Sequence, residues 1–178
     1  MDAPDDLVLR LVTPADVPAL TELVHEAYAS LAAEGLNVTG ASQDEETTAG
    51  RALRGGCAWV LTEPDGRLVG TVAVSSPPGR GIRSLTSLAL EPDRVWLNQL
   101  AVHPSARGRG LSRVLWGTVR GWALDHGMRS VGLDTAEPVR PLRDMYRRWG
   151  FVEADVVHWP GKTYRSVVML RDLRHEPR

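Results

Sequence analysis

Short apolar runs alternate with amphipathic stretches along the chain. Residues 7–11 are mostly apolar and predict a buried strand, and residues 13–16 follow with an N-capping threonine, a proline at the first helical position and an early acid. Apolar side chains then recur every three or four residues as far as position 31, which predicts an amphipathic helix. A capping box at residues 42–45, led by Ser42, predicts a second and shorter helix that ends near residues 55–56.

The next segment is β-prone and then loses its pattern. Residues 57–62 and 68–74 flank a proline, an aspartate and a glycine, which tight turns favour, so the two runs are expected to pair as a hairpin. Residues 75–93 contain several prolines and glycines and are expected to be irregular, with residues 79–81 forming a mobile loop. Residues 95–102 form the strongest predicted strand, which stops before a proline.

The last part of the chain again alternates helix and strand. A helical repeat of apolar positions runs up to Gly127, a glycine suited to a helix C-terminus. A strand over residues 129–134, a helix over 141–149 and an antiparallel pair of strands over 151–157 and 163–170 complete the pattern. The predicted element order is βααβββαβαββ, which indicates a mixed α/β domain.

Composition and charge describe one ordinary domain and exclude several functions. The 178 residues are 43% hydrophobic and 24% charged, which predicts a single domain over residues 1–178 with its core at about residues 7–170. The net charge of −1 provides no field for nucleic acid or an anionic membrane, and no apolar run is long enough to span a bilayer. The acidic amino terminus and the lone Cys57 favour the cytoplasm, because signal peptides begin with basic residues and a disulfide needs a second cysteine.

The most informative stretch joins the strongest strand to the next helix through glycines. Gly108 and Gly110 stand between that strand and the helix, with Arg107 and Arg109 beside them. Free N–H groups at a helix start, the positive end of the helix dipole and glycines that allow close approach together form an anion site. The spacing matches neither the P-loop nor the dinucleotide fingerprint, so the residues alone indicate only a phosphate-binding loop.

This loop resembles the pyrophosphate loop of the GNAT superfamily of acyl-CoA-dependent N-acetyltransferases. The family pattern, Gln/Arg-x-x-Gly-x-Gly/Ala, is matched over residues 107–112 except that Ser112 replaces the last small residue. Further along the chain, residues 146–151 resemble the family's Tyr-x-x-x-Gly-Phe. The element order is also that of the family, so the resemblance covers residues 7–170 and implies a single mixed, mostly antiparallel sheet flanked by helices.

The resemblance implies which residues hold the cosubstrate acetyl-CoA. Backbone groups of Leu100, Ala101 and Val102 are expected to line the pantetheine arm, and the amides of residues 107–112 are expected to hold the pyrophosphate. The full set of expected cofactor-binding residues is Leu100, Ala101, Val102, Arg107, Gly108, Arg109, Gly110, Leu111, Ser112 and Tyr146. Val139 departs from the pattern, because many members have an asparagine there that contacts the cofactor.

Two catalytic groups follow from the resemblance. The backbone N–H of Leu100, on a strand that the family bulges and splays from its neighbour, is expected to point at the thioester oxygen. Tyr146 is expected to protonate the departing thiolate, with simple packing beneath the cofactor as the alternative. No general base is identified, since Asn98 and Gln99 stand where some members have a glutamate. The remaining candidates, each with a structural interpretation as well, are Glu91, Asp93, Asp134 and His158.

The predicted activity is transfer of an acetyl group from acetyl-CoA to a primary amine by direct attack in a ternary complex. The acceptor is a small molecule or a peptide amine, expected to be gripped by the loop between the first two helices, by residues 75–93 and by the last hairpin. No metal site is predicted, because His103 has no partner at metal-ligand spacing and is interpreted as a structural strand-end residue.

Two other functions stay open. The first is a catalytically degenerate acyl-CoA-binding module of the same fold, which stays open because of Ser112, Val139 and the missing carboxylate on the central strand. The second is a nucleotide- or nucleic-acid-binding protein that uses Arg107, Arg109 and Arg113, although the near-zero net charge argues against binding to nucleic acid. A homodimer is expected only by analogy with the family.

Overall fold

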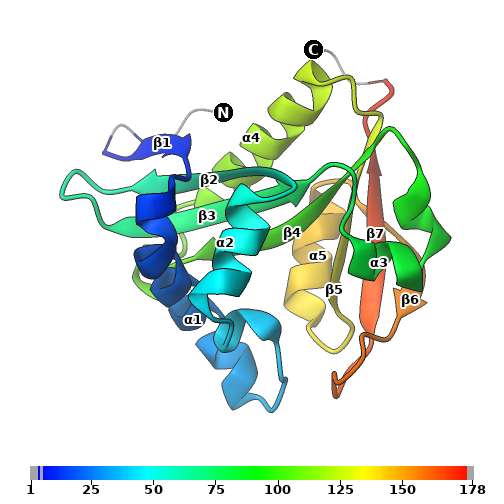
Figure 1. Cartoon of the computed structure of the whole chain (residues 1–178), viewed down its shortest axis with the longest axis horizontal. Helices are drawn as coiled ribbons and strands as arrows, with labels where there is room; N and C mark the ends of the chain where they lie inside the picture. Colours follow the sequence, from blue (N-terminus) through cyan, green and yellow to red (C-terminus); the bar gives the residue numbers. More distant parts are fainter. Residues whose placement is uncertain (1–3, 5, 176–178) are drawn as a thin grey trace. The chain divides into compact units, whose positions relative to one another are not determined.

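The computed structural model describes residue 4 and residues 6–175 (Figure 1). In chain order its elements are β1 (Val8–Leu11), α1 (Val17–Ala33), α2 (Glu45–Leu53), β2 (Gly56–Thr62), β3 (Leu68–Ser75), α3 (Arg80–Leu85), β4 (Arg94–Val102), α4 (Leu111–Asp125), β5 (Ser130–Ala136), α5 (Arg140–Arg148), β6 (Val152–Val157) and β7 (Ser166–Asp172). The strands form one seven-stranded sheet in the order β1-β2-β3-β4-β5-β7-β6. It is mostly antiparallel, with β4 and β5 running parallel, so the predicted fold class is confirmed. Within the described residues, no helix has the length and apolar character needed to cross a lipid bilayer.

One short helix is missing from the predicted element order. α3 and the 3₁₀ turn η3 (Ser87–Leu90) lie between β3 and β4, so the prediction of an irregular segment over residues 75–93 is wrong there. Residues 79–81, predicted as a mobile loop, cap and begin α3. Ile82 is 3% exposed and packs in a cluster that Leu85 and Leu88 join. Burial of this apolar side stabilises a helix too short for its period to be recognised in the sequence.

The turn before α1 is held by a single carboxylate. Asp16 accepts hydrogen bonds from the amide and hydroxyl of Thr13, at 2.7 and 2.8 Å, and from two guanidinium nitrogens of Arg10, both at 2.7 Å. The hydrogen bonds from Arg10 hold the pKa of the Asp16 carboxyl well below its usual range. The predicted capping threonine and early acid are therefore confirmed, although they begin a 3₁₀ turn that precedes the α-helix.

The N-cap of α2 differs from the predicted one. Asp44 caps the helix, because its side chain accepts a hydrogen bond from the Thr47 amide at 2.8 Å. The capping box led by Ser42 is therefore wrong, since the first helical residue comes later in the chain than that box requires. The predicted turn between β2 and β3 is confirmed, with the Glu63 amide donating to the Arg67 carbonyl at 2.9 Å.

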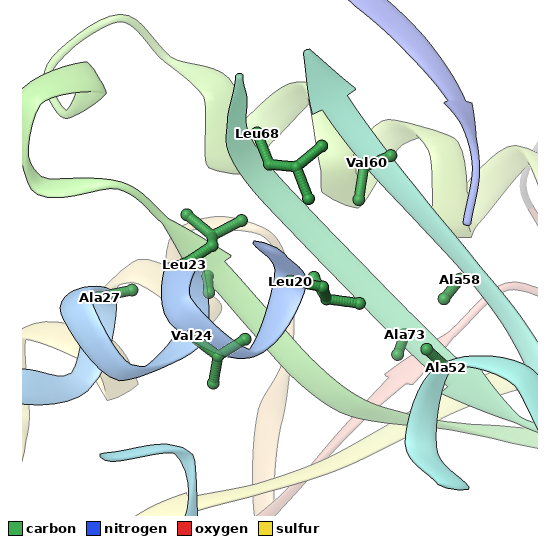
Figure 2. Close-up of a cluster of buried hydrophobic side chains, with 10 residues drawn as sticks. Leu20, Leu23, Val24, Ala27, Ala52, Ala58, Val60, Leu68 and Ala73 are labelled. Atoms are coloured by element: carbon green, nitrogen blue, oxygen red, sulfur yellow. The ribbon is translucent and has the colours of Figure 1, made fainter. Parts of the chain in front are cut away.

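The chain divides into two compact units, and the predicted single domain over residues 1–178 stays a prediction. The first unit comprises Met1–Val74 and Asn98–Val119. Its core consists of apolar side chains of α1 that face β2 and β3, as Figure 2 shows. The buried members are Leu20, Leu23, Val24, Ala27, Ala52, Ala58, Val60, Leu68, Ala73 and Ala101. Leu115 of α4 also packs on β3, because a Cβ at Gly70 would lie 3.2 Å from its Cδ1.

The second unit comprises Ser75–Leu97 and Arg120–Arg178. Its sheet has β5 paired with the first half of β4 in parallel and with β7 in antiparallel orientation, and β6 closes the edge beside β7. The predicted closing pair of strands is thus confirmed. One core cluster on this sheet contains Ile82, Ala89, Trp96, Val157 and Val168.

Candidate functional site

The end of β4 forms the first part of the candidate site. Ala101 is 4% exposed and belongs to the core, while Leu100 and Val102 on either side of it are half-buried, as strand alternation requires. The Tyr28 hydroxyl on α1 donates a hydrogen bond to the Leu100 carbonyl oxygen at 3.1 Å. This bond holds the peptide group between Leu100 and Ala101.

His103 fixes the point where β4 ends. Its amide donates to the Val69 carbonyl at 2.9 Å, and its Nδ1 accepts a hydrogen bond from the Ser105 amide at 3.1 Å. Its Nε2 lies 2.6 Å from Glu26 Oε2. The guanidinium of Arg67 lies 3.1 and 3.2 Å from the two ring nitrogens. These contacts agree with the structural role predicted for His103.

The glycine loop between β4 and α4 forms the second part. Gly108 and Gly110 have φ angles of +80° and +74°, in the left-handed region that favours glycine. A Cβ built at either position meets no described atom within 4 Å, so the space beside the loop is open. On one side of the glycines, the Arg107 amide donates a hydrogen bond to the Pro104 carbonyl. On the other side, the Arg113 amide donates to the Gly110 carbonyl.

The amides between these two hydrogen bonds are available to a ligand. Those of residues 108–112 donate to no backbone carbonyl of the described part of the chain. They include the first two residues of α4, Leu111 and Ser112, whose amides have no acceptor within the helix itself. Together with the positive end of the helix dipole, these amides can hold a phosphate group.

The two loop arginines already have partners within the first unit. Arg107 Nη2 donates to the Ala27 carbonyl on α1 at 2.8 Å. Arg109 Nη2 pairs with Asp6 Oδ2 at 2.5 Å. The Arg107 hydrogen bond fastens the loop to α1. The binding of a cofactor by Arg107 and Arg109 stays a prediction.

Three consecutive residues of α1 thus contact the candidate site. Glu26 binds His103, the Ala27 carbonyl binds Arg107, and Tyr28 binds the Leu100 carbonyl. The sequence alone does not reveal the roles of these three residues, because Tyr28 fits the apolar face of the helix and no motif marks the others. These hydrogen bonds dock α1 onto both the strand end and the glycine loop.

Tyr146 lies in the second unit, on α5, and is 7% exposed. Its ring makes edge contacts with Trp149 and Phe151, at centroid distances of 5.6 and 5.7 Å. Its carbonyl accepts hydrogen bonds from the amides of both residues at 3.0 Å, and these bonds close the end of the helix. Val139 is the N-cap of α5 and is 8% exposed. Leu100 and the glycine loop lie in the first unit, so joint action with Tyr146 on one cofactor stays a prediction.

The four base candidates, all in the second unit, differ in their surroundings. Asp93 Oδ2 pairs with Arg129 Nε at 3.3 Å, and His158 Nε2 is 2.8 Å from the Lys162 carbonyl. Glu91 is exposed. Asp134 is half-buried and accepts hydrogen bonds from two tryptophan side chains. Within the described residues, no group of three or more His, Cys, Asp and Glu side chains could hold a metal ion.

Comparison with known proteins gives the family. The sequence profile described as the Acetyltransferase (GNAT) family matches residues 20–151. No curated protein matches the chain significantly.

Solved structures agree in fold. The ribosomal-protein-S18-alanine N-acetyltransferase of Escherichia coli has a TM-score of 0.71 at 15% identity, over 96% of each chain. A GCN5-related N-acetyltransferase from Kribbella flavida has a TM-score of 0.70 at 21% identity, over 96% of this chain and 100% of that one. Ard1 from Thermoplasma volcanium has a TM-score of 0.68 at 15% identity, over 94% of this chain and 97% of that one. Sequence identities this low show only that the folds are alike. The family profile, by contrast, matches most of the sequence itself. The chain belongs to the GNAT acetyltransferase family.

Proposed function

We propose that the chain transfers the acetyl group of acetyl-CoA to a primary amine by direct attack in a ternary complex. The observation that carries the proposal is the glycine loop before α4, whose amides over residues 108–112 have no backbone acceptor among the described residues and stand beside open space. A pyrophosphate has the charge and the acceptor oxygens that such a loop binds. Membership of the GNAT family supports acetyl-CoA as the molecule that carries this pyrophosphate.

The chain's own groups supply the rest of the chemistry. Acetyl-CoA, when bound, brings a thioester carbonyl and a thiolate leaving group. The Leu100 amide donates to the carbonyl oxygen as negative charge develops on it, a kind of stabilisation worth about 3–4 kcal/mol in enzymes. The neutral amine nitrogen attacks the carbonyl carbon, and the Tyr146 hydroxyl donates a proton to the sulfur as the carbon–sulfur bond breaks. The proton that the amine nitrogen loses goes to bulk water.

Direct attack by the amine fits the state of the only cysteine. Cys57 lies at the start of β2, and burial raises the pKa of its thiol. The protonated thiol is a poor nucleophile, so an acyl-enzyme on this side chain is not part of the proposal.

The role of Tyr146 is tested by Tyr146→Phe. The change removes only the hydroxyl and keeps the ring contacts with Trp149 and Phe151. The turnover rate should fall by about 100-fold or more, as for loss of a general acid, while the affinity for acetyl-CoA changes little. A mutant with the wild-type rate excludes the hydroxyl from the mechanism.

The function itself is tested by two measurements on the wild-type chain. Acetyl-CoA should raise the melting temperature, and free CoA thiol should appear when spermidine, L-lysine, an aminoglycoside and a peptide with a free amino terminus are offered in turn. Stabilisation without thiol release on any amine indicates an acyl-CoA-binding module. Salt-sensitive binding of oligonucleotides without any response to acetyl-CoA indicates a nucleic-acid-binding protein instead.

A further inference from the structure

One carboxylate in the second unit receives hydrogen bonds from two indoles. Asp134 Oδ1, on β5, accepts from Trp96 Nε1 at 3.2 Å, and Asp134 Oδ2 accepts from Trp159 Nε1 at 2.8 Å. Trp96 is 1% exposed, whereas Asp134 and Trp159 are half-buried. A carboxylate oxygen accepts more than one hydrogen bond, so each oxygen keeps acceptor capacity on a side chain that solvent reaches.

Two glycines allow the indoles to reach this carboxylate. A Cβ at Gly132, the register partner of Trp96 on β5, would lie 2.4 Å from Trp96 Cζ3. A Cβ at Gly81 on α3 would lie 2.7 Å from Trp159 Cζ3. Both rings therefore lie directly against backbone, and a side chain at either glycine would displace a ring from its position. Gly132 and Gly81 thus give Trp96 and Trp159 the space that their positions beside Asp134 require.

Among residue 4 and residues 6–175, no basic side chain pairs with the Asp134 carboxylate. In the described part of the chain Asp134 has no ion pair, and its hydrogen-bond donors are the two indoles. Arg94, two positions before Trp96 on β4, is bound elsewhere: its Nε donates to Ser130 Oγ at 2.9 Å and its Nη1 donates to the Leu88 carbonyl. The uncharged indole donors stabilise the carboxylate but leave its charge in place.

A second acid lies on the same face of the sheet. Val168 on β7 is the register partner of Asp134 on β5 and of Asp155 on β6, so the two carboxylates flank it. The Thr86 hydroxyl donates to Asp155 Oδ2 at 2.6 Å, and this hydrogen bond lowers the pKa of the Asp155 carboxyl. Asp155 is therefore a second carboxylate on the face of the sheet that carries Asp134.

We propose that Asp134, held between Trp96 and Trp159, binds an ammonium group of the acceptor. The assignment of this ligand as an acceptor rests on the proposed acetyl transfer, while the binding of an organic ammonium ion does not. An ammonium group offers three donors to the free acceptor sites of the carboxylate and neutralises its charge. Partial shielding from water by the indoles strengthens this charge interaction. Trp159 lies in the last hairpin and Gly81 in the 75–93 segment, two of the regions expected from the sequence to grip the acceptor.

A purely structural role for Asp134 makes a different prediction. In that case the carboxylate serves only to accept the two indole N–H groups, and its charge has no ligand. Asp134→Asn removes the charge and keeps one acceptor oxygen, whereas Trp159→Phe removes one indole donor and keeps the charge. Ammonium binding should weaken at least ten-fold in the first variant and persist in the second, while a structural role predicts effects on stability alone.

The indole N–H signals of the six tryptophans provide a direct assay by two-dimensional NMR. Butylammonium chloride, titrated at constant ionic strength, should shift the Trp96 and Trp159 signals saturably and leave the other four in place. The uncharged 1-butanol is the matched control and should shift neither. Binding should weaken at least ten-fold in Asp134→Asn, and the Trp96 shift should persist in Trp159→Phe. Equal shifts with 1-butanol, or no saturable shift in the wild-type chain, overturn the proposal without any variant having to fold.

Kinetics separate this inference from the proposed function. Where the wild-type chain acetylates spermidine, Asp134→Asn should raise the KM for spermidine at least ten-fold and leave the KM for acetyl-CoA unchanged. An unchanged spermidine KM overturns the inference and leaves acetyl transfer standing. Saturable butylammonium shifts in a chain that acetylates no amine support the ammonium site and remove the proposed function.

Discussion

Gly110→Ala separates the backbone geometry of the glycine loop from its charge. Gly110 has a φ of +74°, and a Cβ there projects into open space beside the loop. An L-residue in this conformation costs about 1–2 kcal/mol, and the chain can relieve that strain only by rotating the loop's peptide groups. The amides of residues 108–112 would then change direction.

The backbone strain and the lost hydrogen bond determine how far the melting temperature and the affinity for acetyl-CoA should fall. For a chain of this length, 1 kcal/mol shifts the melting temperature by about 2–4 °C, so the strain alone lowers it by about 2–8 °C. A lost hydrogen bond between an amide and a charged phosphate costs about 1.5–3 kcal/mol, which weakens acetyl-CoA binding by a factor of about ten or more. At a ligand concentration of about 100 wild-type Kd, stabilisation falls from about 2.7 to about 1.4 kcal/mol.

Thermal unfolding with and without acetyl-CoA measures both effects. Gly66→Ala is the matched control, because Gly66 has a φ of +90° and open space around its missing Cβ but lies in the turn between β2 and β3. Both variants should melt at lower temperature than wild type, and only Gly110→Ala should lose about half of the ligand-induced rise. A full ligand-induced rise in Gly110→Ala would refute the reasoning, because the loop amides would then not be the anion donors.

Three further changes test other parts of the structure. Tyr28→Phe removes the hydroxyl that binds a β4 carbonyl, so the melting temperature should fall by about 2–6 °C and turnover should fall with it; unchanged turnover in a destabilised variant would limit Tyr28 to a structural role. Gly132→Ala places a Cβ 2.4 Å from Trp96 Cζ3 and should cost about 1–3 kcal/mol in urea unfolding; a neutral effect would show that the ring moves freely. Arginine hydrogen bonds lower the pKa of Asp16, so its carboxylate stabilises the fold above about pH 4. The stability difference between wild type and Asp16→Asn should shrink from about pH 6 to about pH 3, and a constant difference would contradict the assignment.

The elements that the sequence predicts well are those whose signals are local. The strand 95–102, the loop glycines and the helix that follows are marked by apolar runs, glycines and a helical period, and all three appear in the structure. The short helix α3 was missed because its apolar side consists of little more than Ile82 and Leu85, which is too few positions to define a period. Its stability comes from tertiary burial, which no local pattern reports.

The contacts that build the candidate site are mostly long-range and were not predictable in this way. Tyr28 and Leu100 are 72 positions apart, and nothing about a tyrosine on an apolar helix face indicates the carbonyl to which it donates. Asp134 is one of four candidate general bases that the sequence does not distinguish from one another. Only the folded arrangement distinguishes it, because the two indoles that bind it come from different segments of the chain.

The two loop arginines show what contacts add to residue type. The Arg109–Asp6 pair is largely exposed, with side chains 34% and 61% accessible, and such pairs contribute about 0–1 kcal/mol. Arg109 can therefore leave Asp6 at little cost and turn to an anion at the loop. Arg107 is held more firmly, because its guanidinium donates a hydrogen bond to the part-buried Ala27 carbonyl on α1. This hydrogen bond fastens the glycine loop to α1. The positions of the loop's amide donors therefore depend on the helix as well.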